Sequence, residues 1–85
     1  MLNMCDIKDT KYVLYIEKVS IEDDMPKVNF MMGLVKEICE DKVILEDGEV
    51  PHNRIRMYFG ADHKQIENPD VMDYVTEQFK RLKNK

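Results

Sequence analysis

Residues 43–59 read VILEDGEVPHNRIRMYF and predict three consecutive antiparallel strands. The Asp-Gly pair at positions 47–48 stands between two apolar runs, which is a strong signal for a two-residue hairpin loop. With that loop, Leu45 would face Val50 across the ladder. Beyond Pro51, apolar and polar side chains alternate, as they do in a strand with one buried and one wet face. The alternation predicts that the buried face carries Ile55, Met57 and Phe59. The solvent-exposed face would carry Arg54, Arg56 and Tyr58.

Two longer strands are expected upstream of this stretch. Residues 11–19, KYVLYIEKV, carry β-branched and aromatic side chains on both faces, which favours a central strand. An acidic turn at residues 22–26 separates it from a second strand over residues 27–39. Gly33 interrupts that second strand, which predicts a bulge or bend that lets the sheet curl.

The C-terminal part predicts one amphipathic helix over residues 69–83, after a loop over residues 60–67. Asn68 is the expected N-cap, and Pro69 suits the first helical position. Side chains that could cover a core follow at helical spacing: Val71, Tyr74, Val75, Gln78, Phe79 and Leu82. The basic side chains of the last turns complement the negative end of the helix.

Residues 32–55 combine a glycine-bent strand, a tight turn, a short strand and an acidic hairpin. In this they resemble the middle strands of small curled sheets of the Sm-like or SH3-like kind, and the resemblance implies a barrel-like sheet. The predicted fold class is α+β: a curled antiparallel sheet of four or five strands with one C-terminal amphipathic helix. Residues 1–85 are expected to form a single domain with its sheet over residues 11–59, and residues 1–10 can be either ordered or flexible.

The charge of the chain favours a basic partner over a nucleic acid. The 85 residues contain 17 acidic and 13 basic side chains, for a net charge of −4. Four of the bases lie in the last six residues, so residues 1–79 carry 17 acids and nine bases, a net charge of −8. Such a body repels phosphates and anionic headgroups and attracts cations and basic proteins.

Several other classes of protein are disfavoured by composition. Cys5 and Cys39 have neither metal-ligand nor disulfide-framework spacing, which fits a reducing, cytoplasmic setting. The first residues show no basic and apolar signal pattern, and no apolar run approaches the length of a membrane span. The three glycines are isolated, so the phosphate-cradling glycine motifs are absent from the sequence.

The acidic turns suggest the leading hypothesis for function. In an antiparallel meander alternate turns emerge at the same end of the sheet, so the first and third turns are expected to be neighbours. They would gather six carboxylates on one rim: Glu22, Asp23, Asp24, Glu46, Asp47 and Glu49. Such a rim would let a small acidic protein cover the basic, nucleic-acid-binding surface of a target, as DNA-mimic inhibitors of phages and bacteria do. Equally, acidic turns can simply keep a small protein soluble.

A rival hypothesis places nucleic-acid binding on the wet face of the last strand. That face interleaves basic, aromatic and amide side chains, as binders of single strands often do: His52, Asn53, Arg54, Arg56 and Tyr58. The alternative is a solvated strand face whose arginines pair with nearby carboxylates.

Catalytic and metal sites are not expected. His63 and Glu67 have the spacing of helical metal ligands but lack a third partner. Cys39 and His52 have no flanking motif of a nucleophilic enzyme. We therefore expect binding without catalysis, metal or cofactor. Because the core is thin and a sheet edge is left unpaired, we also expect a homodimer formed through an edge strand or the helix.

Overall fold

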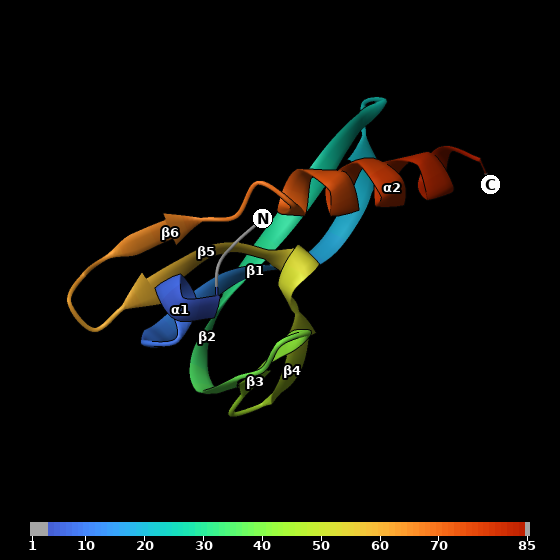
Figure 1. The fold of residues 1–85 in the computed structure, drawn as a ribbon. Coiled ribbons are helices and arrows are strands. Elements are labelled where there is room, and N and C mark those ends of the chain that lie inside the picture. The colour runs from blue at the N-terminus through green and yellow to red at the C-terminus, as the bar shows by residue number, and fades with distance from the viewer. Residues whose placement is uncertain (1–3, 85) are drawn as a thin grey trace.

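The structure is a computed structural model, and it describes residues 4–84 of the chain. Six antiparallel strands form one sheet, and a long C-terminal helix crosses it (Figure 1). Along the chain the elements are α1 (Met4–Ile7), β1 (Thr10–Glu22), β2 (Met25–Ile38), β3 (Lys42–Leu45), β4 (Gly48–Pro51), the 3-10 turn η1 (His52–Arg54), β5 (Ile55–Gly60), β6 (Gln65–Glu67) and α2 (Val71–Lys83).

The predicted fold class is confirmed: the chain is α+β, with a curled antiparallel sheet and one C-terminal helix. The sheet has six strands rather than four or five, in the order β4-β3-β2-β1-β5-β6. The extra strand is β6, which lies where a loop was expected. No pairing joins β4 to β6 within residues 4–84, so the sheet is curled but not closed into a barrel.

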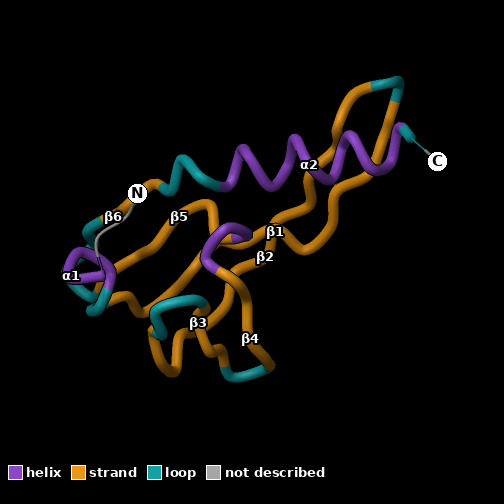
Figure 2. The backbone as a smooth tube through the Cα atoms, turned by 45° about the vertical axis from the view of Figure 1, so that its right-hand side comes forward, coloured by secondary structure: helices purple, strands orange, loops and turns teal. Residues whose placement is uncertain are grey.

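The β1–β2 hairpin projects beyond the rest of the sheet (Figures 1 and 2). Its two-residue turn has positive φ at both positions, 52° at Asp23 and 65° at Asp24, which is the type I′ geometry that matches the twist of a hairpin. β3 pairs with β2 only from Val35 onward, and β5 pairs with β1 only up to Tyr15. The half of the hairpin nearer its turn is therefore paired with neither β3 on the β2 side nor β5 on the β1 side.

The loop of the β3–β4 hairpin lies one residue earlier in the chain than predicted. Its two-residue loop is Glu46–Asp47, so Leu45 pairs with Gly48 and Val43 pairs with Val50. The expected pairing of Leu45 with Val50 is wrong. The correction shifts the register by two residues, which is a full strand period, so all three apolar side chains still point into the core. Gly48 takes a φ of 155° directly after this loop.

Gly33 does not form the expected bulge, because the β1–β2 register runs through it without a break. A Cβ atom at this position would lie 2.7 Å from Leu45 Cδ1 and 3.3 Å from Tyr15 Cε1, so glycine lets two core side chains approach the strand. The irregularities lie instead at Lys11 and Glu17 in β1, at Lys36 in β2 and at Arg56 in β5. These positions bend the sheet.

An unpredicted bulge in β5 changes which of its side chains are buried. Tyr15 pairs with Ile55 while Leu14 pairs with Met57, which leaves Arg56 as the extra residue. Ile55 and Tyr58 consequently share the core face, and both are fully buried. The predicted faces are confirmed for Ile55 but wrong for Tyr58, which is buried, and for Met57 and Phe59, which are only half-buried on the opposite face.

Two separate hydrophobic clusters hold these elements together. The first lies inside the curl of the sheet and contains Ile7, Val13, Val43, Leu45, Val50, Ile55 and Tyr58. The second lies between α2 and the hairpin and contains Ile16, Val71 and Val75, with Val19, Val28 and Tyr74 around it. Of the segment expected to be either ordered or flexible, Ile7 is buried in the first cluster, and residues 1–3 lie outside the described part of the chain.

The predicted helix is confirmed, but it begins at Val71 and its N-cap is Asp70, so the expected N-cap at Asn68 and first helical position at Pro69 are wrong by two residues. Asn68 is 1% exposed, and its side-chain oxygen accepts a hydrogen bond of 3.0 Å from the Asp70 N–H in the turn that leads into the helix. The apolar stripe points to the sheet, with Val71 and Val75 buried. Within residues 4–84, neither α2 nor α1 is long and apolar enough to cross a membrane.

Candidate functional site

The two acidic turns lie at opposite ends of the molecule (Figure 1). The Glu46 N–H donates a 3.3 Å hydrogen bond to the Leu34 carbonyl, whereas the Asp23–Asp24 turn precedes Met25 at the other end of the same strand. Nine residues of extended chain separate these points, roughly 30 Å at about 3.3 Å per residue. The prediction that the two acidic turns are neighbours is therefore wrong. β3 has four residues against fourteen in β2, so its turn emerges only partway along the longer strand.

Three of the six predicted rim carboxylates already have cationic partners. Glu22 pairs with Lys27 at 3.0 Å, Glu49 with Lys42 at 3.0 Å and Asp24 with Lys83 at 3.6 Å. The hydrogen bond and charge of Glu49 raise the pKa of Lys42. The exposed carboxylates of Asp23, Glu46 and Asp47 have no ion pair with any described residue. Charge available to a partner thus remains at both turns.

The predicted nucleic-acid face is built into the fold instead of lying open to solvent. Tyr58 is fully buried, and its hydroxyl donates to His52 Nδ1 at 2.8 Å. His52 Nε2 donates to the Cys39 carbonyl at 2.7 Å, because a carbonyl can only accept. Both ring nitrogens of His52 are therefore used in holding η1 against the end of β2.

The two arginines of this set are also engaged. Arg54 Nη2 donates to the Ile16 carbonyl at 2.6 Å and to the Glu17 carbonyl at 3.3 Å, while Nε reaches Ile16 at 3.1 Å. These contacts satisfy the carbonyls of the β1 bulge. Arg56 pairs with Glu67 at 2.5 Å across β5 and β6. Of the five predicted nucleic-acid contacts, only Asn53 is exposed rather than buried or half-buried, so the structure does not gather them on one exposed surface.

Burial of the Tyr58 phenol should make the protein sensitive to alkali. Burial raises the pKa of Tyr58 well above its ordinary value of 10.0, so the folded protein keeps this proton where an unfolded chain would lose it. The resulting stability is complete below pH 10.0 and is lost as the pH rises further, at up to about 1.4 kcal/mol per pH unit. Urea midpoints measured on either side of that pH should show this fall, and Tyr58→Phe should remove it.

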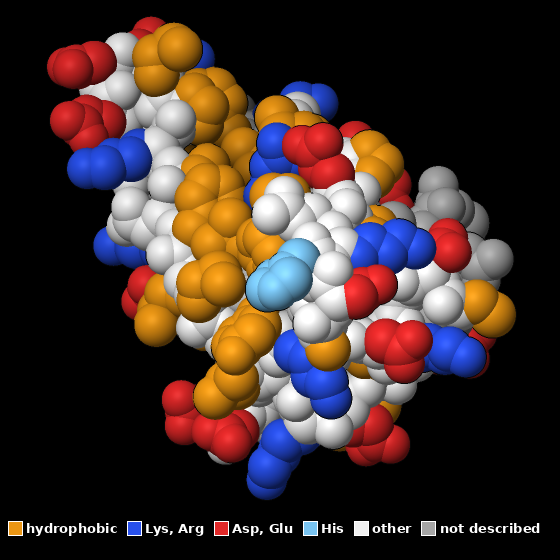
Figure 3. All heavy atoms as spheres, turned by 90° about the vertical axis from the view of Figure 1, so that its left-hand side faces the viewer, with side chains coloured by type: hydrophobic (Ala, Val, Ile, Leu, Met, Phe, Trp, Pro, Cys, Tyr) orange, Lys and Arg blue, Asp and Glu red, His pale blue; other side chains and the backbone are white. Residues whose placement is uncertain are grey.

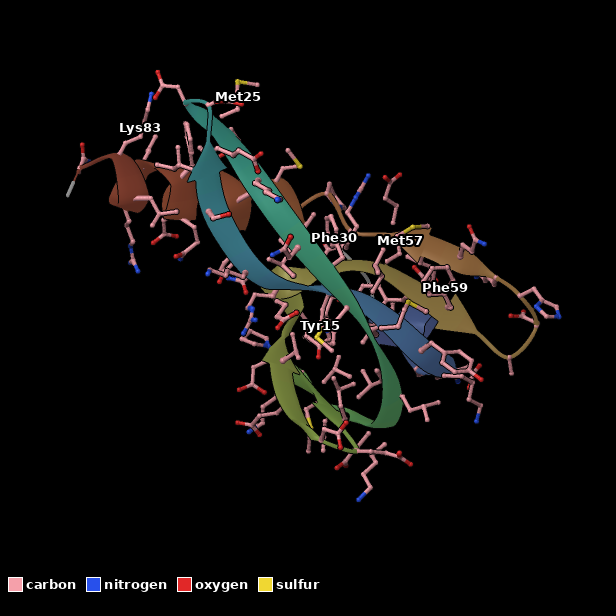
Figure 4. All side chains as sticks on the ribbon, turned by 180° about the vertical axis from the view of Figure 1, so that it is seen from behind. Tyr15, Met25, Phe30, Met57, Phe59 and Lys83 are labelled. Atoms are coloured by element: carbon pink, nitrogen blue, oxygen red, sulfur yellow. The ribbon has the colours of Figure 1, made fainter. Side chains whose placement is uncertain are left out.

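An exposed apolar face lies on β2, β1 and β5, away from the single acidic rim that was expected to form the binding surface. We define the apolar face as Tyr12, Leu14, Phe30, Met32, Leu34, Met57 and Phe59. Tyr12 pairs with Leu34 and with Phe59, and Leu14 pairs with Met32 and with Met57, so these side chains share one side of the sheet. Figure 4 shows Phe30, Met57 and Phe59 in a row across the strands, with Tyr15 toward β3 and β4.

The apolar face is open to solvent. The exposed fractions of Phe30, Tyr12, Leu34 and Met32 lie between 44% and 55%. Figure 3 shows hydrophobic side chains in a band that runs down one side of the molecule, with charged groups on either side. An open groove of about 600 Å³ crosses this region and is lined by Tyr12, Met32, Leu34, Phe59 and also by Glu46.

The sequence did contain a signal for this face. Val28, Phe30, Met32 and Leu34 alternate along β2, which places them on one side of any strand that includes them. The 13 residues of α2 span roughly 20 Å, so one helix covers only part of a long hairpin. Val28 lies under α2, and the remaining three do not.

No protein-family model, curated protein or solved structure matches this chain. The chemistry of the site therefore comes from its own residues. Within residues 4–84, no group of three or more His, Cys, Asp or Glu side chains is placed to hold a metal ion. His63 lies in the turn before β6 with a φ of 65°, and Glu67 lies within that strand and pairs with Arg56. What the surface offers is apolar area bordered by carboxylates, which suits contact with another macromolecule.

Proposed function

We propose that this protein is a non-enzymatic module that binds a basic protein through the apolar face. The observation that carries the proposal is the set of large apolar side chains that β1, β2 and β5 leave uncovered. Contiguous exposed apolar surface on a small protein commonly marks a protein-protein contact. Aromatic and methionine side chains supply much of the binding energy at such contacts.

The charge of the protein supports a basic partner. The net charge of −4, with −8 in residues 1–79, steers a positively charged protein toward the surface and disfavours nucleic acid. Glu46 lines the groove beside Tyr12 and Leu34, so a cationic side chain of the partner can meet a carboxylate there. The partner is therefore basic, as in the DNA-mimic hypothesis, but it contacts an apolar centre rather than a single acidic rim.

The imidazole of His52 has structural partners in the fold, which supports binding without catalysis. One ring nitrogen bonds to the hydroxyl of Tyr58, a member of the first hydrophobic cluster, and the other bonds to the main-chain carbonyl of Cys39. The scarcity of cysteines and their spacing support a cytoplasmic setting, where thiols stay reduced.

A pair of matched methionine variants tests the proposal. Met32 on the apolar face and Met72 on the outer side of α2 are 55% and 57% exposed, so a charge at either position meets solvent equally well. Met32→Glu should reduce the amount of captured partner at least about tenfold, the equivalent of 1.4 kcal/mol. Met72→Glu should leave capture unchanged. Capture would be measured by quantitative mass spectrometry of proteins retained from lysate on the immobilised chain.

Circular dichroism should show that both variants keep the wild-type spectrum and melting temperature within a few degrees. Equal capture by wild type and Met32→Glu would contradict the proposal, because the apolar face would then contribute nothing to binding.

A further inference from the structure

The β2 strand has a long free edge. Between Met25 and Leu34 its neighbour on one side is β1, and no described strand lies on the other side, because β3 begins to pair at Val35. Free strand edges of this length present a template for another chain, and proteins usually shorten or block them. Pro26 blocks the first position of this edge, since proline has no N–H to offer.

The turn geometry fixes which backbone groups point outward from this edge. In a two-residue type I′ hairpin the residues that close the turn, Glu22 and Met25, hydrogen-bond each other. Backbone groups then alternate along the strand, so those of Lys27 and Asn29 point to β1 and those of Val28, Phe30 and Met32 point away from it.

An independent contact gives the same assignment. The Leu34 carbonyl accepts the Glu46 N–H from the side opposite β1, and Leu34 belongs to the same alternating set as Phe30 and Met32. The one irregularity of this ladder is the extra residue Glu17 of β1, opposite Asn29 and Phe30; β2 itself has no extra residue between Met25 and Leu34, so its alternation continues. The outward N–H and C=O groups of Val28, Phe30 and Met32 therefore have no strand partner within residues 4–84.

The free edge runs between the two acidic turns. Asp23 and Asp24 lie at its beginning, and Glu46 and Asp47 lie at its end, where Leu34 meets β3. Roughly 30 Å separates these turns, the length of about nine extended residues. Asp23, Glu46 and Asp47 have no ion pair with a described residue, so carboxylates without cationic partners are present at both ends.

We propose that β2 receives an extended segment of the basic partner as an additional strand, with lysine or arginine at both ends of that segment. The backbone of the segment bonds to Val28, Phe30 and Met32, its alternate side chains rest on the apolar face, and its terminal cations meet the two acidic turns. This inference rests on the proposed function and specifies the form of its partner.

A second copy of the chain fits this edge less well. Antiparallel pairing of two β2 edges over Met25–Leu34 brings the Asp23–Asp24 turn of each chain beside the Glu46–Asp47 turn of the other. Like charges so placed repel and disfavour the pairing. The expected homodimer should therefore use another surface, and a β2–β2 dimer is an outcome that the test must distinguish.

The test uses a synthetic nonapeptide, Lys-Lys-Val-Thr-Val-Thr-Val-Lys-Lys, added to the 15N-labelled full chain. Binding should slow amide hydrogen exchange at Val28, Phe30 and Met32 at least about tenfold. The amides of Lys27 and Asn29, already bonded to β1, should not change and serve as internal controls. Unchanged exchange at the three outward amides in the presence of bound peptide would overturn the inference.

Two altered peptides separate the contributions of charge and backbone. Replacing the four lysines by glutamates should weaken binding at least about tenfold at low salt. N-methylation of the five central residues should abolish binding, because the residues that would lie opposite Val28, Phe30 and Met32 can no longer donate backbone hydrogen bonds. Equal binding of the acidic peptide, or of the N-methylated one, would exclude strand addition between acidic turns.

A variant pair tests the edge itself. Met32→Pro removes an outward N–H and none that bonds to β1, so it should weaken binding of the lysine peptide at least about tenfold, whereas Met32→Thr retains the N–H and should bind. Light scattering without peptide monitors self-association, and a dimer that protects the same three amides would overturn the inference. Loss of capture in Met32→Glu together with unprotected amides would preserve the proposed function and reject strand addition.

Discussion

Tyr58→Ala is expected to lower the free energy of unfolding by about 4 kcal/mol, the largest effect of any single substitution proposed for this chain. Tyr58 is fully buried in the first hydrophobic cluster, so its removal leaves a cavity among Val13, Ile55 and Ile7. The substitution also removes the hydroxyl that donates to His52. Urea unfolding followed by far-UV circular dichroism would measure the loss.

Tyr58→Phe separates the two contributions. It keeps the ring in the core and leaves His52 Nδ1 without its donor, for an expected loss of about 1–2 kcal/mol. If both variants unfolded at the wild-type urea midpoint, Tyr58 would not hold η1 and β5 together as the contacts indicate.

Arg54→Met should lower the free energy of unfolding by about 2–3 kcal/mol, because three hydrogen bonds from a charged group to main-chain carbonyls are lost. Ile16 and Glu17, which supply those carbonyls, form the bulge of β1. The guanidinium also lies 5.9 Å from the centre of the Tyr74 ring, so the substitution weakens the packing of α2 on β1 and η1. The same denaturation experiment reports the change.

Arg56→Met is the matched control for Arg54→Met. Its ion pair with Glu67 is partly exposed, at 34% for Arg56 and 60% for Glu67, and solvent-accessible pairs of this kind contribute less than about 1 kcal/mol. Equal destabilisation by the two substitutions would contradict the structural role assigned to Arg54 and would reopen the strand as a surface for binding.

The parts of the fold that depend on local sequence were predictable. The spacing of Val71 and Val75 defines the buried face of α2, and Asn68 marks the turn that precedes the helix, without reference to the rest of the chain. The alternating apolar runs and the acidic turns likewise indicate antiparallel strands. Each of these signals lies within a few neighbouring residues, and each is present in the structure.

The errors arose where distant parts of the chain decide the outcome. The bulge at Arg56 follows from the pairing of β5 with β1, and it turns Tyr58 inward and Met57 outward. The separation of the acidic turns follows from the unequal lengths of β2 and β3. The apolar face follows from how little of the hairpin α2 covers. Periodicity assigns residues to a face, but it does not say what covers that face.

The division of the interior into two hydrophobic clusters has a consequence for native-state fluctuations. The smaller cluster joins α2 to the hairpin through Ile16, Val71 and Val75, and the larger one includes no residue of α2. Undocking of α2 therefore costs the contacts of the smaller cluster and leaves the larger one intact. The α2 helix should act as a cooperative unit of its own, opening more often than the molecule unfolds globally and transiently exposing the side of the hairpin that it covers.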